Sequence, residues 1–232
     1  MTKPATDSPL KIPFVEELSK CKAIADASPI LEVKGERITV DTLNWPNQFP
    51  YHPLTVVSLA HDGKRIFVEF FVRCNYLRAV NTENNSPVHQ DSCVEFFLAP
   101  KGRTPYFNFE FNCIGTLHAA RRQDRHSGTP LTDEELAKVE RYASCGTRPF
   151  REMEGLFSWS LIYAIPLELL GLTWEGKPIE MMGNFYKCAD LTADPHFLSW
   201  APIDTPEPDF HRPEFFKEIV LEPAENTQQK QC

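Results

Sequence analysis

The sequence lacks an excess of basic residues. Its 232 residues include 24 Lys and Arg against 32 Asp and Glu, which gives a formal net charge of −8. A protein that grips nucleic acid needs clustered positive charge, and the one basic cluster, Arg121, Arg122 and Arg125, is flanked by Asp124. We therefore expect neither a nucleic-acid partner nor binding to an anionic membrane surface.

Long apolar runs are also missing. No segment approaches the roughly 20 apolar residues that a membrane-spanning helix requires. Residues 1–14 contain no apolar stretch of the length found in signal peptides. The sequence as it stands is predicted to be cytoplasmic, or extracytoplasmic if the N-terminus has been trimmed.

The seven cysteines form no C-x-x-C pair. Cys74, Cys93, Cys113 and Cys188 lie within apolar strand patterns, so most cysteines are expected to be reduced, buried and small apolar residues. Since no Cys or His pair has the spacing of zinc ligands, spacing alone predicts no metal site.

What the sequence does contain is strongly alternating strands. In residues 106–113 the side chains of Tyr106, Asn108, Glu110 and Asn112 fall on one face, and three Phe and Cys113 fall on the other. The Phe-bearing face predicts a thick apolar core. The opposite face predicts a row of hydrogen-bonding groups exposed on an open sheet, which would suit a polyhydroxylated ligand.

Turn signals place further strands along the chain. Asp62-Gly63 between two apolar runs, 54–60 and 65–73, predicts a β-hairpin. Thr132 with Glu135 forms a capping box, so a short helix is expected to run on through ELAKVERY. Other strands are predicted at 36–43, 93–98, 156–165, 180–188 and 216–221, a helix at 14–28 that ends before Pro29, and a charged loop at 121–130.

Many short strands and few helices predict an all-β fold, an antiparallel β-sandwich with jelly-roll or immunoglobulin-like layers. We expect an N-terminal extension at residues 1–35 that packs on the domain. The sandwich itself is expected at 36–222, followed by a polar tail at 223–232.

Candidate binding residues come from the polar strand face and from one long loop. Asn108, Glu110 and Asn112, with Glu95 from the neighbouring strand, could form a hydrogen-bonding rim around a sugar. The same oxygen atoms could bind Ca²⁺. A loop of about 25 residues, 189–214, is long enough to be functional. Four of its side chains are candidates, namely Trp200, Phe210, His211 and Arg212.

Two further candidates lie near the strand that begins at Cys93. His89 precedes Asp91-Ser92 and could contact a ligand, although a hydrogen-bonding role at the loop end fits equally well. Arg78 follows Tyr76-Leu77 at a strand exit and could clamp a hydroxyl or carboxylate group.

Several of these stretches occur in a familiar order. DSCVEFF, NFEFNCIGT, NFYKCAD, PHFLSW and FHRPEFF together resemble carbohydrate-binding module family 9, and more closely the bacterial family 9-like carbohydrate-binding proteins. The resemblance spans roughly residues 36–222. It implies a β-sandwich that binds oligosaccharide or polysaccharide without cleaving it, in carbohydrate catabolism, with a glycoside hydrolase on another chain as a possible partner.

The resemblance also implies roles for single residues. In such modules two aromatic rings sandwich a sugar, and the matching positions here are His89 and Phe210. The acidic residue of the family's strand matches Glu95, and a basic position falls at Glu110. His in place of a larger aromatic ring and Glu in place of a basic residue imply weaker or altered sugar binding.

Two other functions remain open on the residues alone. Glu95 and Glu110 could act as the carboxyl pair of a glycoside hydrolase. A sandwich could also hold haem through His89 or His211 with Met181 or Met182. No nucleophile elbow, phosphate-binding loop or dinucleotide fingerprint is present.

Overall fold

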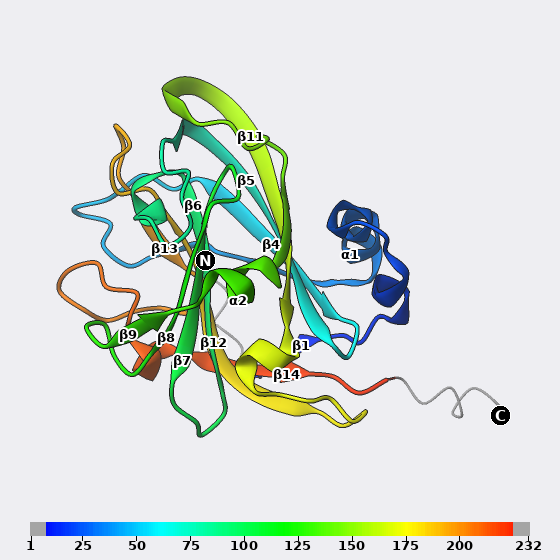
Figure 1. Cartoon of the computed structure of the whole chain (residues 1–232). Coiled ribbons are helices and arrows are strands. Elements are labelled where there is room, and N and C mark those ends of the chain that lie inside the picture. Colours follow the sequence, from blue (N-terminus) through cyan, green and yellow to red (C-terminus); the bar gives the residue numbers. More distant parts are fainter. Residues whose placement is uncertain (1–7, 225–232) are drawn as a thin grey trace.

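Two β-sheets stacked face to face make up the computed structural model, which describes residues 8–224 (Figure 1). The predicted antiparallel β-sandwich is confirmed. Most of the predicted polar tail, residues 225–232, lies outside the described residues, as does Cys232.

The larger sheet has nine strands, with the order β1-β14-β12-β6-β7-β8-β9 and with β13 and β3 attached through β12. All of its pairs are antiparallel except β1 with β14. The strands are β1 (Leu10–Ile12), β3 (Thr42–Leu43), β6 (Cys93–Pro100), β7 (Tyr106–Asn112), β8 (Leu117–Arg122), β9 (Gly128–Pro130), β12 (Ile179–Cys188), β13 (Phe197–Ser199) and β14 (Lys217–Leu221).

The smaller sheet has five antiparallel strands in the order β10-β11-β5-β4-β2. They are β2 (Glu36–Thr39), β4 (Leu54–His61), β5 (Arg65–Ala79), β10 (Glu140–Ala143) and β11 (Phe150–Pro166). The hairpin predicted at Asp62-Gly63 is confirmed, since it joins β4 to β5. The Asp62 carboxylate accepts the backbone N–H groups of Lys64 and Arg65 and so closes the turn.

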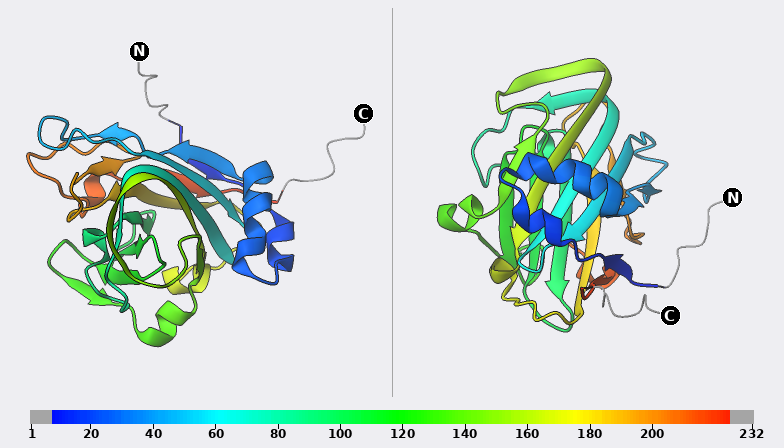
Figure 2. Two further views of the ribbon diagram at one scale, coloured as in Figure 1. Left: turned by 90° about the horizontal axis from the view of Figure 1, so that it is seen from above. Right: turned by 90° about the vertical axis from the view of Figure 1, so that its right-hand side faces the viewer.

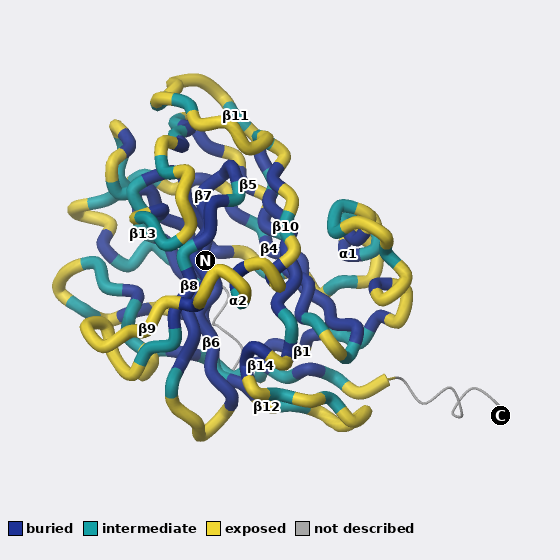
Figure 3. Tube along the Cα trace, viewed as in Figure 1, coloured by how far each residue is buried: buried dark blue, intermediate teal, exposed yellow. Residues whose placement is uncertain are grey.

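The main core lies between the two sheets and is built from stacked aromatic rings. Phe96 and Phe185 stack with ring centroids 4.1 Å apart, and Phe111 stacks on Tyr163 at 4.3 Å. Burial of such rings contributes on the order of 2–3 kcal/mol each before entropy costs. In Figure 3 the central strands β6 and β7 are buried along nearly their whole length.

Short helices cover the outer face of the smaller sheet (Figure 2). They are η1 (Glu16–Lys20), η2 (Ile24–Ala27) and α1 (Ser28–Lys34), and Leu18 and Leu31 pack there against Phe67. The expectation that Pro29 ends a helix was wrong. Pro29 stands in the first turn of α1, where its missing N–H leaves no intrahelical hydrogen bond unmade.

Two other local predictions need correction. The capping box of Thr132 and Glu135 is present, but α2 (Asp133–Ala137) stops early and the chain enters β10 at Glu140. The segment 121–130 is not all loop, because it includes the end of β8 and all of β9. The remaining short helices are η3 (Val88–Gln90), η4 (Leu167–Leu170) and η5 (Pro213–Phe215).

The polar face of β7 is buried, which corrects the expectation of an open sheet face. The predicted alternation is present, with Phe107, Phe109 and Phe111 in the core between the sheets. Asn108 and Glu110 face the other way and are equally buried. A second apolar layer covers this outer face, with Trp45, Phe197 and Phe210 packed over β6 and β12.

Loop 189–214 is held over the sheet by hydrogen bonds to its backbone. The Asn184 side chain accepts from the Ala201 N–H at 2.8 Å and donates to the Ala201 carbonyl at 3.0 Å. The Trp45 indole donates to the Thr205 carbonyl at 2.7 Å, and the Tyr186 hydroxyl donates to the Phe210 carbonyl at 3.1 Å. The loop is therefore an ordered layer of the fold.

Among residues 8–224, no helix is long and apolar enough to cross a membrane.

The β4–β5 turn provides a test of the packing. Gly63 has a φ of +84°, and an added Cβ would lie 2.5 Å from the Trp174 ring. Gly63→Ala is expected to lower the free energy of unfolding by roughly 2–4 kcal/mol, because strain at positive φ adds to overpacking. Gly146→Ala, at φ +74° with no described atom within 4 Å, should cost only about 1–2 kcal/mol. Equal losses in urea unfolding would show that Trp174 does not press on the turn.

Candidate functional site

A pocket of about 220 Å³ lies between the outer face of the larger sheet and loop 189–214. Strands β6, β7, β8 and β12 supply its floor, and the loop supplies much of its wall. The lining residues are His89, Glu95, Glu110, Arg122, Arg125, Cys188, Asp190, Phe197, Pro208, Asp209, Phe210 and His211.

Strand register places two carboxyl groups side by side on the pocket floor. Glu95 of β6 stands directly opposite Glu110 of β7, and both point away from the inter-sheet core because their neighbours in sequence point into it. Glu95 is 3% exposed and Glu110 is 4% exposed. Two buried carboxyl groups on adjacent strands cannot both carry a full charge without strong repulsion.

Burial therefore sets the protonation of this pair. It raises the pKa of Glu110 to about 7, although a hydrogen bond from Asn108 and the charge of Arg122 lower it. Burial, together with the neighbouring Glu110, raises the pKa of Glu95 well above its ordinary value. Both carboxyl groups therefore hold a proton more tightly than an exposed Glu does, because burial raises the pKa of each.

Asn108 connects the pair to a cation. Its amide nitrogen donates to Glu110 Oε1 at 2.8 Å, and its amide oxygen accepts from Arg122 Nε at 2.9 Å. Arg122 in turn donates to the Arg125 carbonyl, which ties β8 to the turn before β9. Asn108 does not line the pocket itself, but it fixes the orientation of a carboxyl group that does.

The aromatic residues of the wall are packed tightly against the protein. Phe210 is 9% exposed and stacks on Tyr186 with centroids 4.2 Å apart, so one face of its ring is covered. His211 packs on Phe97, and its Nδ1 lies 3.0 Å from the Tyr106 hydroxyl. Phe197, which is only partly buried, has more ring surface to offer a ligand.

Two thiols lie at the base of the pocket, where Cys188 lines the floor and Cys93 is fully buried beside it. Cys93 and Cys188 stand opposite each other at the ends of β6 and β12, and both contact Glu95. Burial raises the pKa of both thiols, that of Cys93 to about 12, so they are protonated and donate S–H to the carboxyl group. Spacing could not reveal this cluster because it is assembled from two strands far apart in the chain.

Besides Asn108, four predicted residues lie outside the pocket, within the described part of the chain. Asn112 donates to the Asp91 carboxylate, and Arg78 pairs with the same carboxylate at 3.4 Å. Trp200 packs against Phe185 at the edge of the core. Arg212 pairs with Glu214 on the surface. Asn112 and Arg78 hold the loop before β6 through Asp91, and none of these four side chains lines the pocket.

Five predicted residues do line the pocket, namely His89, Glu95, Glu110, Phe210 and His211. Sequence reasoning missed the other lining residues. Arg122 and Arg125 were visible only as a basic cluster, and Arg125 pairs with Asp209 of the loop at 2.9 Å. The long loop was the signal that could have pointed to Asp190, Phe197 and Asp209.

The methionines do not support the haem alternative. Met181 lies in the core between the sheets and is fully buried. Met182 pairs with Ala99, six residues along β12 from Cys188, which corresponds to about 20 Å of strand. Neither side chain is among those that line the pocket with His89 and His211.

Comparison with known proteins supports a ligand-binding role for this pocket. The family model for carbohydrate-binding family 9 matches residues 28–221. The chain belongs to carbohydrate-binding family 9. This membership makes carbohydrate binding the function of the domain. A comparison with curated proteins gives no match.

Solved structures agree with the family assignment. A candidate carbohydrate-binding protein from Bacteroides uniformis ATCC 8492 is 34% identical with a TM-score of 0.83, over 93% of this chain and 100% of that one. Two family 9 modules from Caldicellulosiruptor kristjanssonii share the fold. One, in complex with cellotriose, has 11% identity and a TM-score of 0.59, over 97% of this chain and 99% of that one. The other, in complex with glucose, has 13% identity and a TM-score of 0.56, over 95% and 100%.

His211 gives the site a measurable pH dependence. Burial, with the charges of Arg122 and Arg125, lowers its pKa to about 3, whereas an unfolded His titrates near 6.5. Below pH 6.5 the unfolded chain gains a proton that the folded chain does not, so this contribution to stability is lost as pH falls. Wild type should lose about 2–3 kcal/mol relative to His211→Asn between pH 7.5 and 4.5.

Urea unfolding of both proteins at the two pH values checks this expectation. Asn is chosen because its side-chain oxygen can occupy the place of Nδ1 beside Tyr106. His52→Asn is the control, since it makes the same substitution at an exposed position away from the pocket. A stability difference between wild type and His211→Asn that does not change with pH would contradict the argument.

Proposed function

We propose that the pocket between the larger sheet and loop 189–214 binds a terminal unit of an oligosaccharide. The observation that carries the proposal is the pair of buried carboxyl groups, Glu95 and Glu110, at the base of a pocket in a family 9 domain. Sugar hydroxyls donate and accept hydrogen bonds, and a carboxyl group that is fixed before binding accepts them without paying the entropy of ordering.

The polar groups are held in place by the protein. Asn108 fixes Glu110 from one side, and Arg122 fixes Asn108. Arg125 is held by Asp209. A ligand therefore meets a set of oriented donors and acceptors, which favours selectivity for one arrangement of hydroxyl groups.

The apolar contribution is smaller than in a pair of parallel aromatic rings. Phe210 has one ring face covered by Tyr186, and His89 offers a small ring. Phe197 adds a partly buried edge to the wall. Since hydrogen bonds to the ligand replace hydrogen bonds to water, we expect a dissociation constant in the micromolar range or weaker, about −8 kcal/mol at most.

The size of the pocket limits the ligand. Pockets that enclose drug-sized molecules usually have about 300–1,000 Å³, and this one is smaller. We propose that it takes one end unit and that the rest of the chain lies outside. Because modules of this fold are solved with cellotriose and with glucose, glucose-based oligosaccharides are the first ligands to test. A glycoside hydrolase on another chain is the proposed partner.

A glycan array followed by calorimetry tests the proposal. Wild type should bind a limited set of glycans, and Glu110→Gln should weaken binding about 10-fold or more, because a charged acceptor is lost at unchanged shape. Glu36→Gln, an exposed Glu on β2, is the matched control and should bind as wild type does. Phe210→Ala is unsuitable, since truncating a buried, stacked ring would cost the fold several kcal/mol.

If wild type binds no glycan, or if Glu110→Gln binds every ligand as tightly as wild type, the pocket is not the sugar site. Thermal unfolding of each variant shows whether a loss of binding reflects a loss of structure.

Glycoside hydrolysis is a second candidate, favoured by one observation. Glu95 and Glu110 are adjacent and buried, and burial raises the pKa of both carboxyl groups. Many glycoside hydrolases use a pair of carboxyl groups, one of which is an acid with a raised pKa. Turnover of an aryl glycoside that disappears in Glu95→Gln would support it. The absence of turnover in wild type, together with glycan binding, would leave binding as the function.

A further inference from the structure

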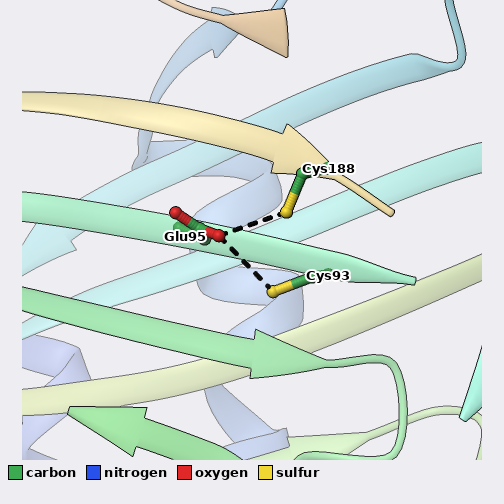
Figure 4. A group of neighbouring side chains, drawn as sticks. All are labelled: Cys93, Glu95 and Cys188. Atoms are coloured by element: carbon green, nitrogen blue, oxygen red, sulfur yellow. Dashed lines mark hydrogen bonds between the residues drawn. The ribbon is translucent and has the colours of Figure 1, made fainter. Parts of the chain in front are cut away.

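Three side chains converge on one point at the base of the pocket, and two of them, Glu95 and Cys188, line its floor. Cys93 and Cys188 are directly paired across β6 and β12, and Glu95 follows Cys93 by two residues on the same strand face. Figure 4 shows both thiols directed at a single carboxyl oxygen of Glu95. The register of two strands, and no flexible loop, sets this arrangement.

The distances suit coordination of one ion. Cys188 Sγ lies 3.1 Å from Glu95 Oε1, and Cys93 Sγ lies 3.8 Å from the same atom. The three ligand atoms all lie within 4.8 Å of one another. Around a tetrahedral zinc ion, with bonds of about 2.3 Å to sulfur and 2.1 Å to oxygen, ligand atoms stand about 3.6–3.8 Å apart. Shifts of about 1 Å or less would complete the site.

Glu95 also lacks a strong partner. Within residues 8–224, its carboxyl group accepts hydrogen bonds from the two thiols and from no other group. Lys187, next to Cys188, does not help, because its Nζ donates to the Cys188 carbonyl at 2.7 Å and lies 2.8 Å from His196 Nε2. A carboxyl group that is 3% exposed and has only weak S–H donors is an uncommon arrangement.

The donor set selects the kind of metal. Two sulfur atoms and one carboxylate oxygen suit Zn²⁺ and disfavour Ca²⁺ and Mg²⁺, which prefer oxygen ligands throughout. Cys188 and Glu95 line the pocket, so a fourth ligand position would face the space where a ligand enters. Three protein ligands with one open position are typical of zinc sites that also bind a small molecule.

We propose that Cys93, Cys188 and Glu95 bind one zinc ion at the floor of the pocket, with its fourth position open to water or to a ligand hydroxyl. Binding displaces the protons held by the two thiols and by the Glu95 carboxyl group, all of which pass to solvent, and puts a cation where the protein places a buried acid. The proposal goes beyond sugar recognition, because the zinc site exists whether or not a sugar enters.

Metal titration without sugar tests it. The full chain is purified under reducing conditions, stripped with a chelator, and titrated with Co²⁺ and then Zn²⁺. One equivalent of Co²⁺ should produce the absorption of a tetrahedral cobalt–thiolate complex, and one equivalent of Zn²⁺ should remove it. Cys93→Ser and Cys188→Ser should each weaken Zn²⁺ binding at least about 100-fold, since loss even of outer groups around a metal costs about 10–100-fold.

Two controls separate this site from other thiols. Cys145→Ser removes a half-buried thiol outside the pocket and should leave the titration unchanged. If the Ser variants do not fold, X-ray absorption on zinc-loaded wild type gives the answer alone, with two sulfur ligands at about 2.3 Å expected.

The proposal is overturned by a zinc shell of oxygen and nitrogen only, by the absence of a cobalt–thiolate band in reduced wild type, or by a band that persists without Cys93 and Cys188. Because no sugar is present, none of these outcomes bears on glycan binding. Conversely, a negative glycan array leaves the zinc result standing.

Discussion

The pairing of β6 with β7 and β12 is the constraint on which the pocket depends. Each residue of these strands has a fixed neighbour, so the side chains of the outer face fall in rows across the sheet. One such row brings Glu95 beside Glu110, and another brings Cys93 beside Cys188. A slip of one residue would turn these groups into the apolar core and bring phenylalanine rings to the pocket.

The second requirement is that this face is covered. Phe197, Phe210 and Trp45 cover the sheet around the pocket, which leaves the carboxyl groups of its floor almost fully buried beside apolar rings. Low polarity there strengthens any hydrogen bond to a ligand and makes an unpaired charge costly. The same burial that raises the pKa of the carboxyl groups therefore makes them sensitive to what occupies the pocket.

Sequence reasoning predicted the strands well, because alternation and turn chemistry are local. The Asp62-Gly63 hairpin, the capping box at Thr132 and the two-faced pattern of residues 106–113 all appear in the structure. Periodicity says which side chains share a face, but it does not say what covers that face. For this reason the row of Asn108 and Glu110 was predicted to be open, although it is buried.

Long-range register was also beyond the sequence. Nothing in the chain spacing connects Cys93 with Cys188, or Arg125 with Asp209, because sheet order and loop path decide these contacts. The family resemblance located Glu95, Glu110 and Phe210 near one another. It could not show that the Phe210 ring is covered by Tyr186, since that depends on how the loop lies.

The hydrogen bonds that hold loop 189–214 allow some of its side chains to be substituted without moving its backbone. Asn184, Trp45 and Tyr186 hold it by backbone atoms of Ala201, Thr205 and Phe210, and a backbone group is present whatever the side chain. A residue such as Pro208, whose side chain makes none of these contacts, can therefore be exchanged while the path of the loop persists. The loop is a natural place for selection, or for library design, to vary ligand preference on a constant frame.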